Sequence, residues 1–288
     1  MTLKCSLPKD FNDPYELFLT VNYREKPEIL AFYGDVVGDL PQHPVTCFSR
    51  SPAILPMWAH YAENLSGVVL AFDEKRLEAS LTEVAFGDID YRTKPDPDLT
   101  EMLHMAYHIG KMRYLYFLGR GVFSSAYYSK AMCWQYEQER RMLVHKKNMR
   151  RGTSLLLADV PNTCLNAIIS GPRATKETLD LVAEKCHLAR CQNYKLKIGR
   201  STSDPYFVDD KGAAHVFKKT SLAKAKRECK SCGEPLSQRG TTCSWCRITF
   251  DHKVAAARRN LLRLLAQHGM LKEYVEGMDE IGRGRRRK

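Results

Sequence analysis

Four cysteines toward the C-terminal end of the sequence have the spacing of a metal site. Cys229 and Cys232 form one C-x-x-C pair, Cys243 and Cys246 form a second, and ten residues separate the pairs. Because each pair can direct two thiolates at one tetrahedral ion, the pattern predicts a closed zinc site with a structural role. Gly233 follows the first pair, where such a turn often needs a positive φ. The alternatives are four free thiols or two disulfides.

Three segments of the N-terminal part combine polar and aromatic residues in a way that differs from an ordinary core. They are FNDPYE at 11–16, CFSRS at 47–51 together with MWAHYA at 57–62, and WQYEQERRMLV at 134–144. In the last segment Glu137 and Glu139 are two residues apart, so on a strand both carboxylates would point to one face. Two like charges on one face repel each other, so they are tolerated only with a neighbouring cation, a substrate hydroxyl or a raised pKa of one carboxylate. The structural alternative is a salt bridge to Arg140 or Arg141.

The two earlier segments have structural explanations beside functional ones. Asn12 and Asp13 precede a proline, which favours a turn in which their side chains hydrogen-bond the backbone. Trp58, His60 and Tyr61 lie close together in the second segment, and a core helix explains them as well as a binding site does.

These segments, in this order, resemble a widespread bacterial family that is described only as a domain of unknown function. The motifs that carry the resemblance are FNDP, MWxHYA and WxxExExR, and the stretch IISGPRATKETLDLVAE at 168–184 resembles the C-terminal portion of the same family. The resemblance covers residues 2–208 and brings no established activity with it.

A second resemblance, to the ADP-ribosyltransferase superfamily, implies a chemistry. In that superfamily a serine on one strand is followed much later by a Glu-x-Glu that opens an apolar strand, and Ser49, Glu137 and Glu139 match this layout. The resemblance implies that Glu139 is the catalytic carboxylate, which stabilises an oxocarbenium-like state during transfer from NAD. It also implies that Glu137 orients the acceptor and that Ser49 orders the nicotinamide pocket.

We also expect a set of cofactor contacts, which no motif of that superfamily fixes. Trp58 or Tyr61 would stack on the nicotinamide ring, and His60, Asn12 and Asp13 would be further NAD-binding residues. The superfamily holds NAD with an Arg or His on its first strand, and the opening segment of this sequence, TLKC, offers no match for that residue.

The basic residues are concentrated in the last quarter of the sequence. The formal net charge is +12, with 45 Lys+Arg against 33 Asp+Glu, and residues 211–288 alone hold 19 and 7 of these. This asymmetry predicts that residues 211–288 bind nucleic acid through its phosphate backbone. A protein partner and a solvated basic face are the alternatives. The expected contacts are Arg258, Arg259 and Arg263 on one side of a helix over 251–267, and Arg285, Arg286 and Arg287 in the tail.

The pattern of apolar residues predicts an α+β fold with a mixed sheet. Strands are expected at 68–72, 141–144, 167–169 and 194–198, and helices over 100–118, capped by Thr100, and from a cap at Thr175. Loops are expected over 41–56 and 146–163. The regions so predicted are an ADP-ribosyltransferase-like body over 1–208, a basic linker over 209–226, a zinc ribbon over 227–250, an amphipathic basic helical region over 251–280 and a disordered arginine-rich tail over 281–288.

Composition excludes several classes of protein. Apolar residues make up 44% of the sequence and aromatic residues 10%, so a sizeable core can form and wholesale disorder is excluded. No apolar run approaches the roughly 18 residues of a membrane-spanning helix. The first residues do not have the layout of a signal peptide, which predicts a cytoplasmic protein without a membrane partner.

Three functions are therefore predicted, in order of preference. The first is an ADP-ribosyltransferase-like effector that uses NAD, and by analogy it would act in phage defence or as a toxin. Its zinc-ribbon module would target nucleic acid or a substrate bound to nucleic acid, and a protein acceptor is a further option. The second is a non-enzymatic nucleic-acid-binding zinc-ribbon protein. The third is a metal-dependent nuclease in which Asp13, Glu16, Glu137 and Glu139 surround Mg²⁺.

Overall fold

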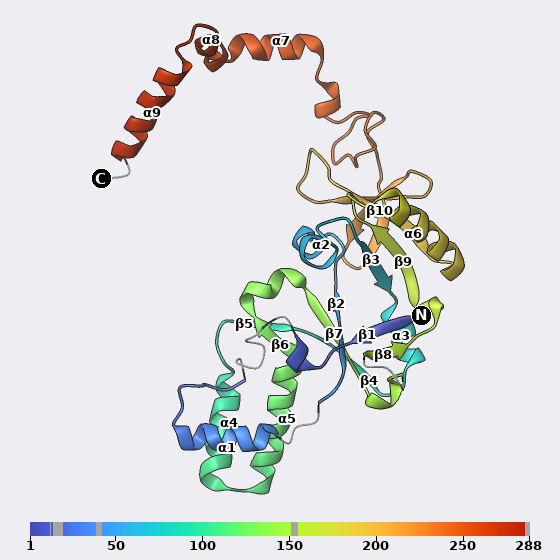
Figure 1. Cartoon of the computed structure of the whole chain (residues 1–288), viewed down its shortest axis with the longest axis vertical. Helices are drawn as coiled ribbons and strands as arrows, with labels where there is room; N and C mark the ends of the chain where they lie inside the picture. The colour runs from blue at the N-terminus through green and yellow to red at the C-terminus, as the bar shows by residue number, and fades with distance from the viewer. Residues whose placement is uncertain (12, 14–19, 39–41, 151–154, 286–288) are drawn as a thin grey trace. The chain divides into compact units, whose positions relative to one another are not determined.

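The computed structural model describes residues 1–11, 13, 20–38, 42–150 and 155–285 and divides into two compact units (Figure 1). The first unit, the body, comprises Met1–Gly199 and Ser203–Ala225. The second unit, the C-terminal module, comprises Arg200–Thr202 and Lys226–Lys288. The body therefore extends beyond residue 208, where the sequence analysis placed its end.

The described strands all belong to the body and form four sheets. A six-stranded mixed sheet has the order β13-β12-β11-β10-β9-β3, with β9 and β10 parallel and the other pairs antiparallel. An antiparallel sheet has the order β2-β7-β4, and β1-β8 and β5-β6 are two-stranded. The strands are β1 (Thr2–Cys5), β2 (Val45–Ser49), β3 (Val68–Phe72), β4 (Val84–Asp88), β5 (Asp90–Arg92), β6 (Ser129–Ala131), β7 (Glu139–Val144), β8 (Leu156–Asp159), β9 (Leu165–Ser170), β10 (Gln192–Lys197), β11 (Tyr206–Asp209), β12 (Ala214–Lys218) and β13 (Ser221–Lys224).

Helices accompany these sheets, so the predicted α+β class with a mixed sheet is confirmed. Those of the body are α1 (Pro27–Gly38), α2 (Leu55–Tyr61), α3 (Glu74–Ser80), α4 (Pro97–Ile109), α5 (Met112–Tyr128) and α6 (Lys176–Ala189). Thr175 caps α6 by accepting from the backbone N–H of Thr178, as predicted. In the part of the chain that the structure describes, no helix is both long and apolar enough to cross a membrane.

The core of the six-stranded sheet follows from the alternation of its strands. Side chains on a strand point alternately to opposite faces, so Leu196 of β10 is fully buried while Lys197 is exposed. Leu196 packs with Ile169 of β9, Phe207 of β11 and Trp58 of α2 in one core cluster. The short helix α2 is thereby fixed against the sheet.

A separate helical core is formed by α1, α4 and α5. Its buried residues include Leu103, Leu118 and Val122. The sequence predicts one helix over 100–118, but the structure has two, because Gly110 adopts a φ of 65° and ends α4. The N-terminal cap of α4 is Asp96 and not Thr100.

Three segments interpreted as irregular contain strands. The expected loop over 41–56 contains β2, the expected loop over 146–163 contains β8, and the expected linker over 209–226 contains β12 and β13. These strands have at most five residues each, which is too short for a clear period-two pattern. β2 and β8 are stabilised by pairing with distant strands, β7 and β1, whereas β12 and β13 pair with each other.

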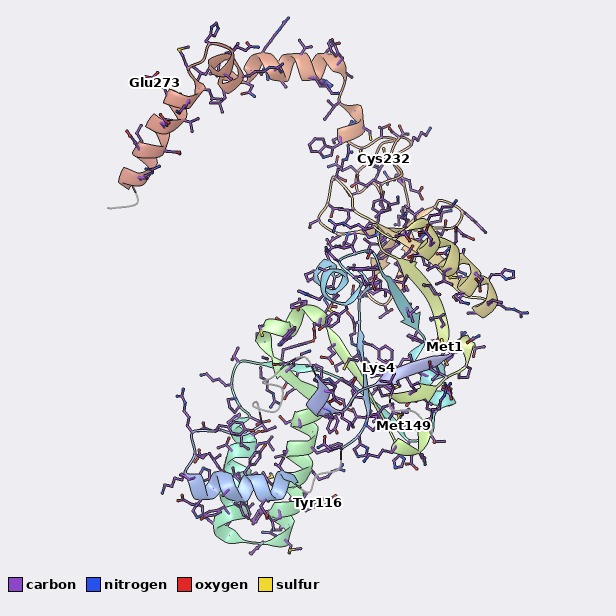
Figure 2. All side chains as sticks on the ribbon, viewed as in Figure 1. Met1, Lys4, Tyr116, Met149, Cys232 and Glu273 are labelled. Atoms are coloured by element: carbon purple, nitrogen blue, oxygen red, sulfur yellow. The ribbon has the colours of Figure 1, made fainter. Side chains whose placement is uncertain are left out.

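The C-terminal module contains the cysteine pairs and three helices, α7 (Phe250–Arg259), α8 (Leu261–Gln267) and α9 (Leu271–Arg285). Figure 2 labels Cys232 at the cysteine pairs and Glu273 on α9. The expected helix over 251–267 is divided at Asn260, which has non-helical backbone angles. The expected disordered tail is helical as far as Arg285, and residues 286–288 lie outside the described residues.

Candidate functional site

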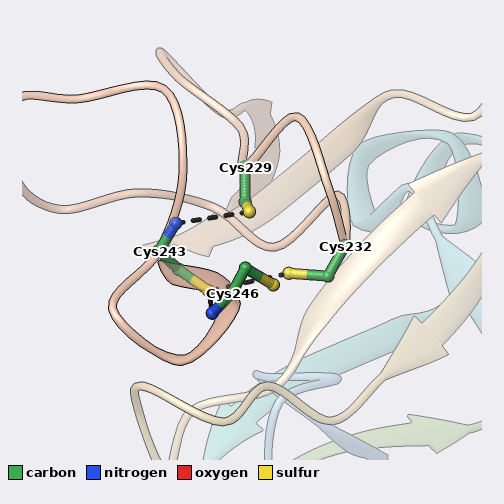
Figure 3. A group of neighbouring side chains, drawn as sticks. All are labelled: Cys229, Cys232, Cys243 and Cys246. Carbon is green, nitrogen blue, oxygen red and sulfur yellow. Dashed lines mark hydrogen bonds between the residues drawn. The ribbon is translucent and has the colours of Figure 1, made fainter. Parts of the chain in front are cut away.

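The four cysteines that the sequence predicts as metal ligands lie together (Figure 3). Their Sγ atoms are all within 4.8 Å of one another, and 3.8 Å separates Cys232 Sγ from Cys243 Sγ. Four thiolates at about 2.3 Å from a tetrahedral zinc ion would be about 3.8 Å apart, so the cluster has the size of such a site. The backbone N–H of Cys243 donates to Cys229 Sγ and lowers the pKa of Cys229 to about 6. The residues present therefore fit a metal ion.

The turn that carries the first cysteine pair is held by two further residues. Gly233 has a φ of 74°, as predicted, and its N–H donates to the carbonyl of Cys229. The side chain of Glu234 is buried and accepts hydrogen bonds from the backbone N–H groups of Arg200 and Ser201 at 3.0 and 2.9 Å. Glu234 therefore joins the segment Arg200–Thr202 to the module, a role that sequence analysis missed.

A group of buried charged side chains lies in the body, where β6, the 3-10 helix η3 (Met132–Glu137) and β7 meet. Lys130 Nζ donates to Glu137 Oε2 at 2.6 Å and to Glu139 Oε2 at 3.1 Å. Arg141 Nε donates to Glu139 Oε1 at 2.7 Å. None of these side chains, which we call the charged cluster (Lys130, Glu137, Glu139 and Arg141), is more than 9% exposed. Two cations thus neutralise two carboxylates away from water.

The two glutamates reach Lys130 from different elements. Glu137 ends η3, Gln138 adopts a left-handed φ of 47°, and Glu139 begins β7. The prediction that both carboxylates share one strand face is therefore wrong, because only Glu139 is on a strand. Ser49 Oγ donates to the backbone carbonyl of Glu137 at 2.7 Å, and the N–H of Glu139 donates to the hydroxyl of Tyr91 at 2.7 Å. These bonds fix the turn between the two carboxylates.

The charges of the cluster shift one another's pKa. Burial lowers the pKa of Lys130, but the charges and hydrogen bonds of the two glutamates outweigh burial and hold that pKa above its ordinary value. Burial raises the pKa of Glu139, with Lys130 opposing the shift. Burial lowers the pKa of Arg141 to about 10, with the carboxylate of Asp13 opposing. Both cations therefore remain charged at neutral pH.

An aromatic cleft of about 510 Å³ lies next to the charged cluster. Its described lining residues are His60 and Tyr61 of α2 and Cys133, Trp134 and Tyr136 of η3. The hydroxyl of Tyr61 donates to Glu137 Oε1 at 2.7 Å, and Lys130 Nζ lies 4.9 Å from the ring centroid of Trp134. One layer of side chains therefore separates the cleft from the charged cluster.

The structure divides the predicted cofactor-binding residues. His60 and Tyr61 line the cleft, but Trp58 is only 1% exposed and donates from Nε1 to the carbonyl of Pro52 at 2.7 Å. The prediction that Trp58 stacks on a ligand is wrong, because this indole is part of the sheet core. Asp13 is buried, and the charge of its carboxylate opposes the lowering of the pKa of Arg141 by burial.

Two of the remaining predicted body residues, Asn12 and Glu16, lie outside the described residues. Arg141 makes the salt bridge that the sequence analysis kept as a structural alternative, whereas Arg140 points elsewhere and pairs with Glu74 and Asp88.

Lys130, the residue that joins the two glutamates, was not among the residues predicted from the sequence. A signal was present, since Lys130 is the lone charged residue in the stretch AYYSKAMCW at 126–134. A charged residue inside an apolar and aromatic stretch is rarely buried without a partner of opposite charge.

The arginines predicted to contact nucleic acid are exposed where they are described. Arg258 and Arg259 lie on α7 and Arg263 lies on α8, on opposite sides of the break at Asn260. The side chain of Arg285 and the residues Arg286 and Arg287 lie outside what the structure describes.

The body thus defines a class of mixed α+β protein with an aromatic cleft over a buried charged cluster. Residues 57–142, from α2 into β7, match a family described as a protein of unknown function (DUF2971). This match confirms the predicted family resemblance over these residues, which contain the described lining of the cleft and all four residues of the charged cluster. No curated protein matches the chain, and no solved structure matches it.

Proposed function

We propose that the body is an ADP-ribosyltransferase-like enzyme that uses NAD as its donor substrate. The proposal rests above all on the aromatic cleft, because its wall residue Tyr61 is hydrogen-bonded to a carboxylate of the predicted Glu-x-Glu pair. The cross-strand register of β2 and β7 also supports it, since Ser49 lies directly opposite Glu139. Residues that the superfamily layout assigns to one site are therefore neighbours here.

The lining of the cleft suits a flat ring with polar substituents. Trp134, Tyr136 and His60 offer ring faces on which a nicotinamide or an adenine can stack. Tyr61 O–H is the present donor to Glu137 Oε1, and a ribose hydroxyl of the substrate can take its place. Glu137, and not Glu139, is then the carboxylate that meets the substrate.

The reaction that we propose uses Glu137 as an ionised carboxylate. The bond between the sugar carbon and the nicotinamide nitrogen breaks, and its electron pair leaves with the nitrogen. Glu137 stabilises the positive charge that develops on the sugar. A nucleophile of the acceptor forms the new bond to the sugar carbon and releases its proton to solvent water. Glu139 positions Lys130, which holds Glu137 in place, and Arg141 in turn holds Glu139.

We further propose that zinc holds the C-terminal module and that the module brings the body to nucleic acid or to a substrate bound to nucleic acid. Four thiolates at tetrahedral spacing favour zinc, and a closed site of this kind supplies folding energy. Residues 226–288 hold 15 Lys+Arg against 7 Asp+Glu. The exposed arginines of α7 and α8 are suited to phosphate contacts.

Transfer of label from NAD tests the proposed activity. Wild-type protein is incubated with NAD labelled in its ADP-ribose part and with cell extract, beside Glu137→Gln and Glu139→Gln. We expect wild type to label an acceptor and both variants to lose about 100-fold or more of the rate. Glu74→Gln, which removes a carboxylate outside the cluster, is the matched control and should keep the wild-type rate. Equal labelling by wild type and both variants would refute the proposal.

The second candidate is a nucleic-acid-binding protein without enzymatic activity, which the charge of the C-terminal module alone supports. A deletion that tests it must begin at Lys226, because residues 214–224 form β12 and β13 of the body. Affinity for DNA and RNA across a salt series should fall strongly on this deletion, and unchanged affinity would exclude the module as the binding site.

The nuclease hypothesis is no longer proposed. Lys130 and Arg141 occupy the positions beside Glu137 and Glu139 that a divalent cation would need. Across the described ranges, the cysteine set is the one group of His, Cys, Asp and Glu side chains close enough to hold a metal ion.

A further inference from the structure

Two cysteines of the body meet where α6 ends and β10 begins. α6 lies beside β9 and β10 (Figure 1), and Cys186 in its last turn is only 5% exposed. Cys191 comes directly before β10, is half-buried and packs against the core cluster that contains Cys186. Both are free thiols, and neither belongs to the metal site or to the described lining of the aromatic cleft.

The turn that ends α6 brings these two residues together. Arg190 adopts a left-handed φ of 55°, and its N–H donates to the carbonyl of His187 at 3.3 Å. The N–H of Cys191 donates to the carbonyl of Cys186 at 3.1 Å. These two bonds form a Schellman motif, in which the residue after the left-handed one packs against the residue five positions earlier. The two cysteines occupy those two positions.

This arrangement suits a disulfide. A disulfide needs Cα atoms about 4.4–6.8 Å apart, and the backbone hydrogen bond between Cys186 and Cys191 keeps the two residues adjacent. Burial, together with the hydrogen bonding and charge of Cys191, raises the pKa of the Cys186 thiol to about 12. The two sulfur atoms are therefore close enough to act on each other. The Cys186 thiol also donates to the carbonyl of Gln192, the first residue of β10, at 3.4 Å.

We propose that Cys186 and Cys191 form a dithiol site that a low-molecular-weight disulfide, such as oxidised glutathione, reversibly oxidises to a disulfide. Cys191 reacts first, because it is the more exposed of the two and because the raised pKa of Cys186 keeps that thiol protonated. The Cys191 thiolate attacks one sulfur of oxidised glutathione. The other sulfur leaves and takes up the proton that Cys191 has lost, and a mixed disulfide remains on Cys191.

The second step closes the bond between the two cysteines. A mixed disulfide at Cys191 carries no thiolate charge, so the part of the raised pKa of Cys186 that comes from that charge disappears. Cys186 Sγ then attacks Cys191 Sγ, and the bound glutathione leaves with the proton of Cys186. The two cysteines together lose two electrons, which reduce one oxidised glutathione to two thiols. The new disulfide joins the last turn of α6 covalently to the residue before β10.

Tryptic fragments of the full-length protein test this proposal, because Arg190 lies between the two cysteines. Zinc-loaded protein is incubated over a series of ratios of oxidised to reduced glutathione. Free thiols are then blocked with N-ethylmaleimide, and the digest is analysed by mass spectrometry. Cleavage after Lys185, Arg190 and Lys195 yields the fragments 186–190 and 191–195. We expect one species that joins both fragments from oxidised protein, and two separate blocked fragments from reduced protein.

The same series in urea shows whether the fold creates the site. In the native turn the thiols are held together, whereas in the unfolded chain they are not. The ratio of oxidised to reduced glutathione that links half of the protein should therefore be at least about 10-fold lower for folded than for unfolded protein.

Single substitutions separate the roles of the two thiols. Cys186→Ser should keep glutathione on Cys191 as a mixed disulfide, because the thiol that displaces it is gone. Cys191→Ser should leave Cys186 without glutathione, because this thiol is buried. Cys164→Ser removes another buried thiol of the body, and this matched control should form the link as wild type does. Wild type without linked fragments at any ratio overturns the proposal, as does linkage at the same ratio in folded and unfolded protein.

Discussion

Replacing Lys130 by Met removes the ammonium between two buried glutamates and leaves a side chain of similar length. In the wild type, Nζ lies 2.6 Å from Glu137 Oε2 and 3.1 Å from Glu139 Oε2. In the variant, Glu137 keeps the hydroxyl of Tyr61 and Glu139 keeps Arg141. The two carboxylates then share Arg141 as their neighbouring cation, and Arg141 also interacts with the buried carboxylate of Asp13.

The expected loss of stability is large for a single substitution. Removing one partner of a buried ion pair costs about 3–5 kcal/mol, because the other charge stays buried without compensation. For a domain of this size, 1 kcal/mol lowers Tm by about 2–4 °C, so Lys130→Met should lower the Tm of the body by about 6–20 °C.

The loss should also depend on pH in a defined direction. In the wild type, burial already raises the pKa of Glu139. Without the ammonium, repulsion between the two carboxylates raises the folded-state pKa of one of them as well. A carboxyl with a raised folded-state pKa stabilises the fold while it is protonated, and this stability is lost as pH rises through that pKa. The difference in Tm between wild type and variant should therefore be smaller at about pH 5 than at about pH 8.

Thermal unfolding followed by circular dichroism at both pH values measures these effects. Lys147→Met is the matched control, because Lys147 makes an exposed ion pair with Glu83 and its side chain is 46% exposed. That substitution should cost less than about 1 kcal/mol. If Lys130→Met loses no more stability than Lys147→Met, and the loss does not depend on pH, the charged cluster does not stabilise the body.

Two further predictions concern the C-terminal module. A strong zinc chelator should abolish the helical dichroism that the module contributes and leave the Tm of the body unchanged. The substitution Cys229→Ser should reduce the amount of bound zinc, measured by atomic spectroscopy. Full zinc content in that variant would contradict the four-thiolate site. Replacing Arg258, Arg259 and Arg263 together by Ala should lower the slope of log affinity for duplex DNA against log salt by about 2–3 units, and an unchanged slope would show that these arginines do not contact phosphates.

Features set by short-range chemistry were predictable from the sequence. Two C-x-x-C pairs direct their thiolates through local turn geometry, so Cys229 and Cys243 could be assigned to one site from spacing alone. The apolar run at 68–72 is visible in the sequence itself and became β3, and Thr175 became a helix cap because it bonds the backbone of Thr178, three residues later.

Features set by long-range pairing were not predictable in this way. Lys130 meets Glu137 only because β6 pairs with β5 and η3 turns back beside it. β8 lies in a segment expected as a loop and is stabilised by its ladder with β1, which comes about 150 residues earlier in the chain. Trp58 was expected at a ligand, but its burial depends on β9, β10 and β11, which follow more than 100 residues later.

Release of nicotinamide from NAD tests the central claim most directly, because it requires no knowledge of the acceptor. Purified protein is incubated with NAD and cell extract, and nicotinamide is quantified by chromatography for wild type, Glu137→Gln, Tyr61→Phe and the control Glu74→Gln. The proposed site predicts release by wild type and by Glu74→Gln, a loss of about 100-fold or more in Glu137→Gln, and a milder change in Tyr61→Phe. Release that is absent in wild type, or equal in wild type and Glu137→Gln, would contradict an NAD-using site at the aromatic cleft.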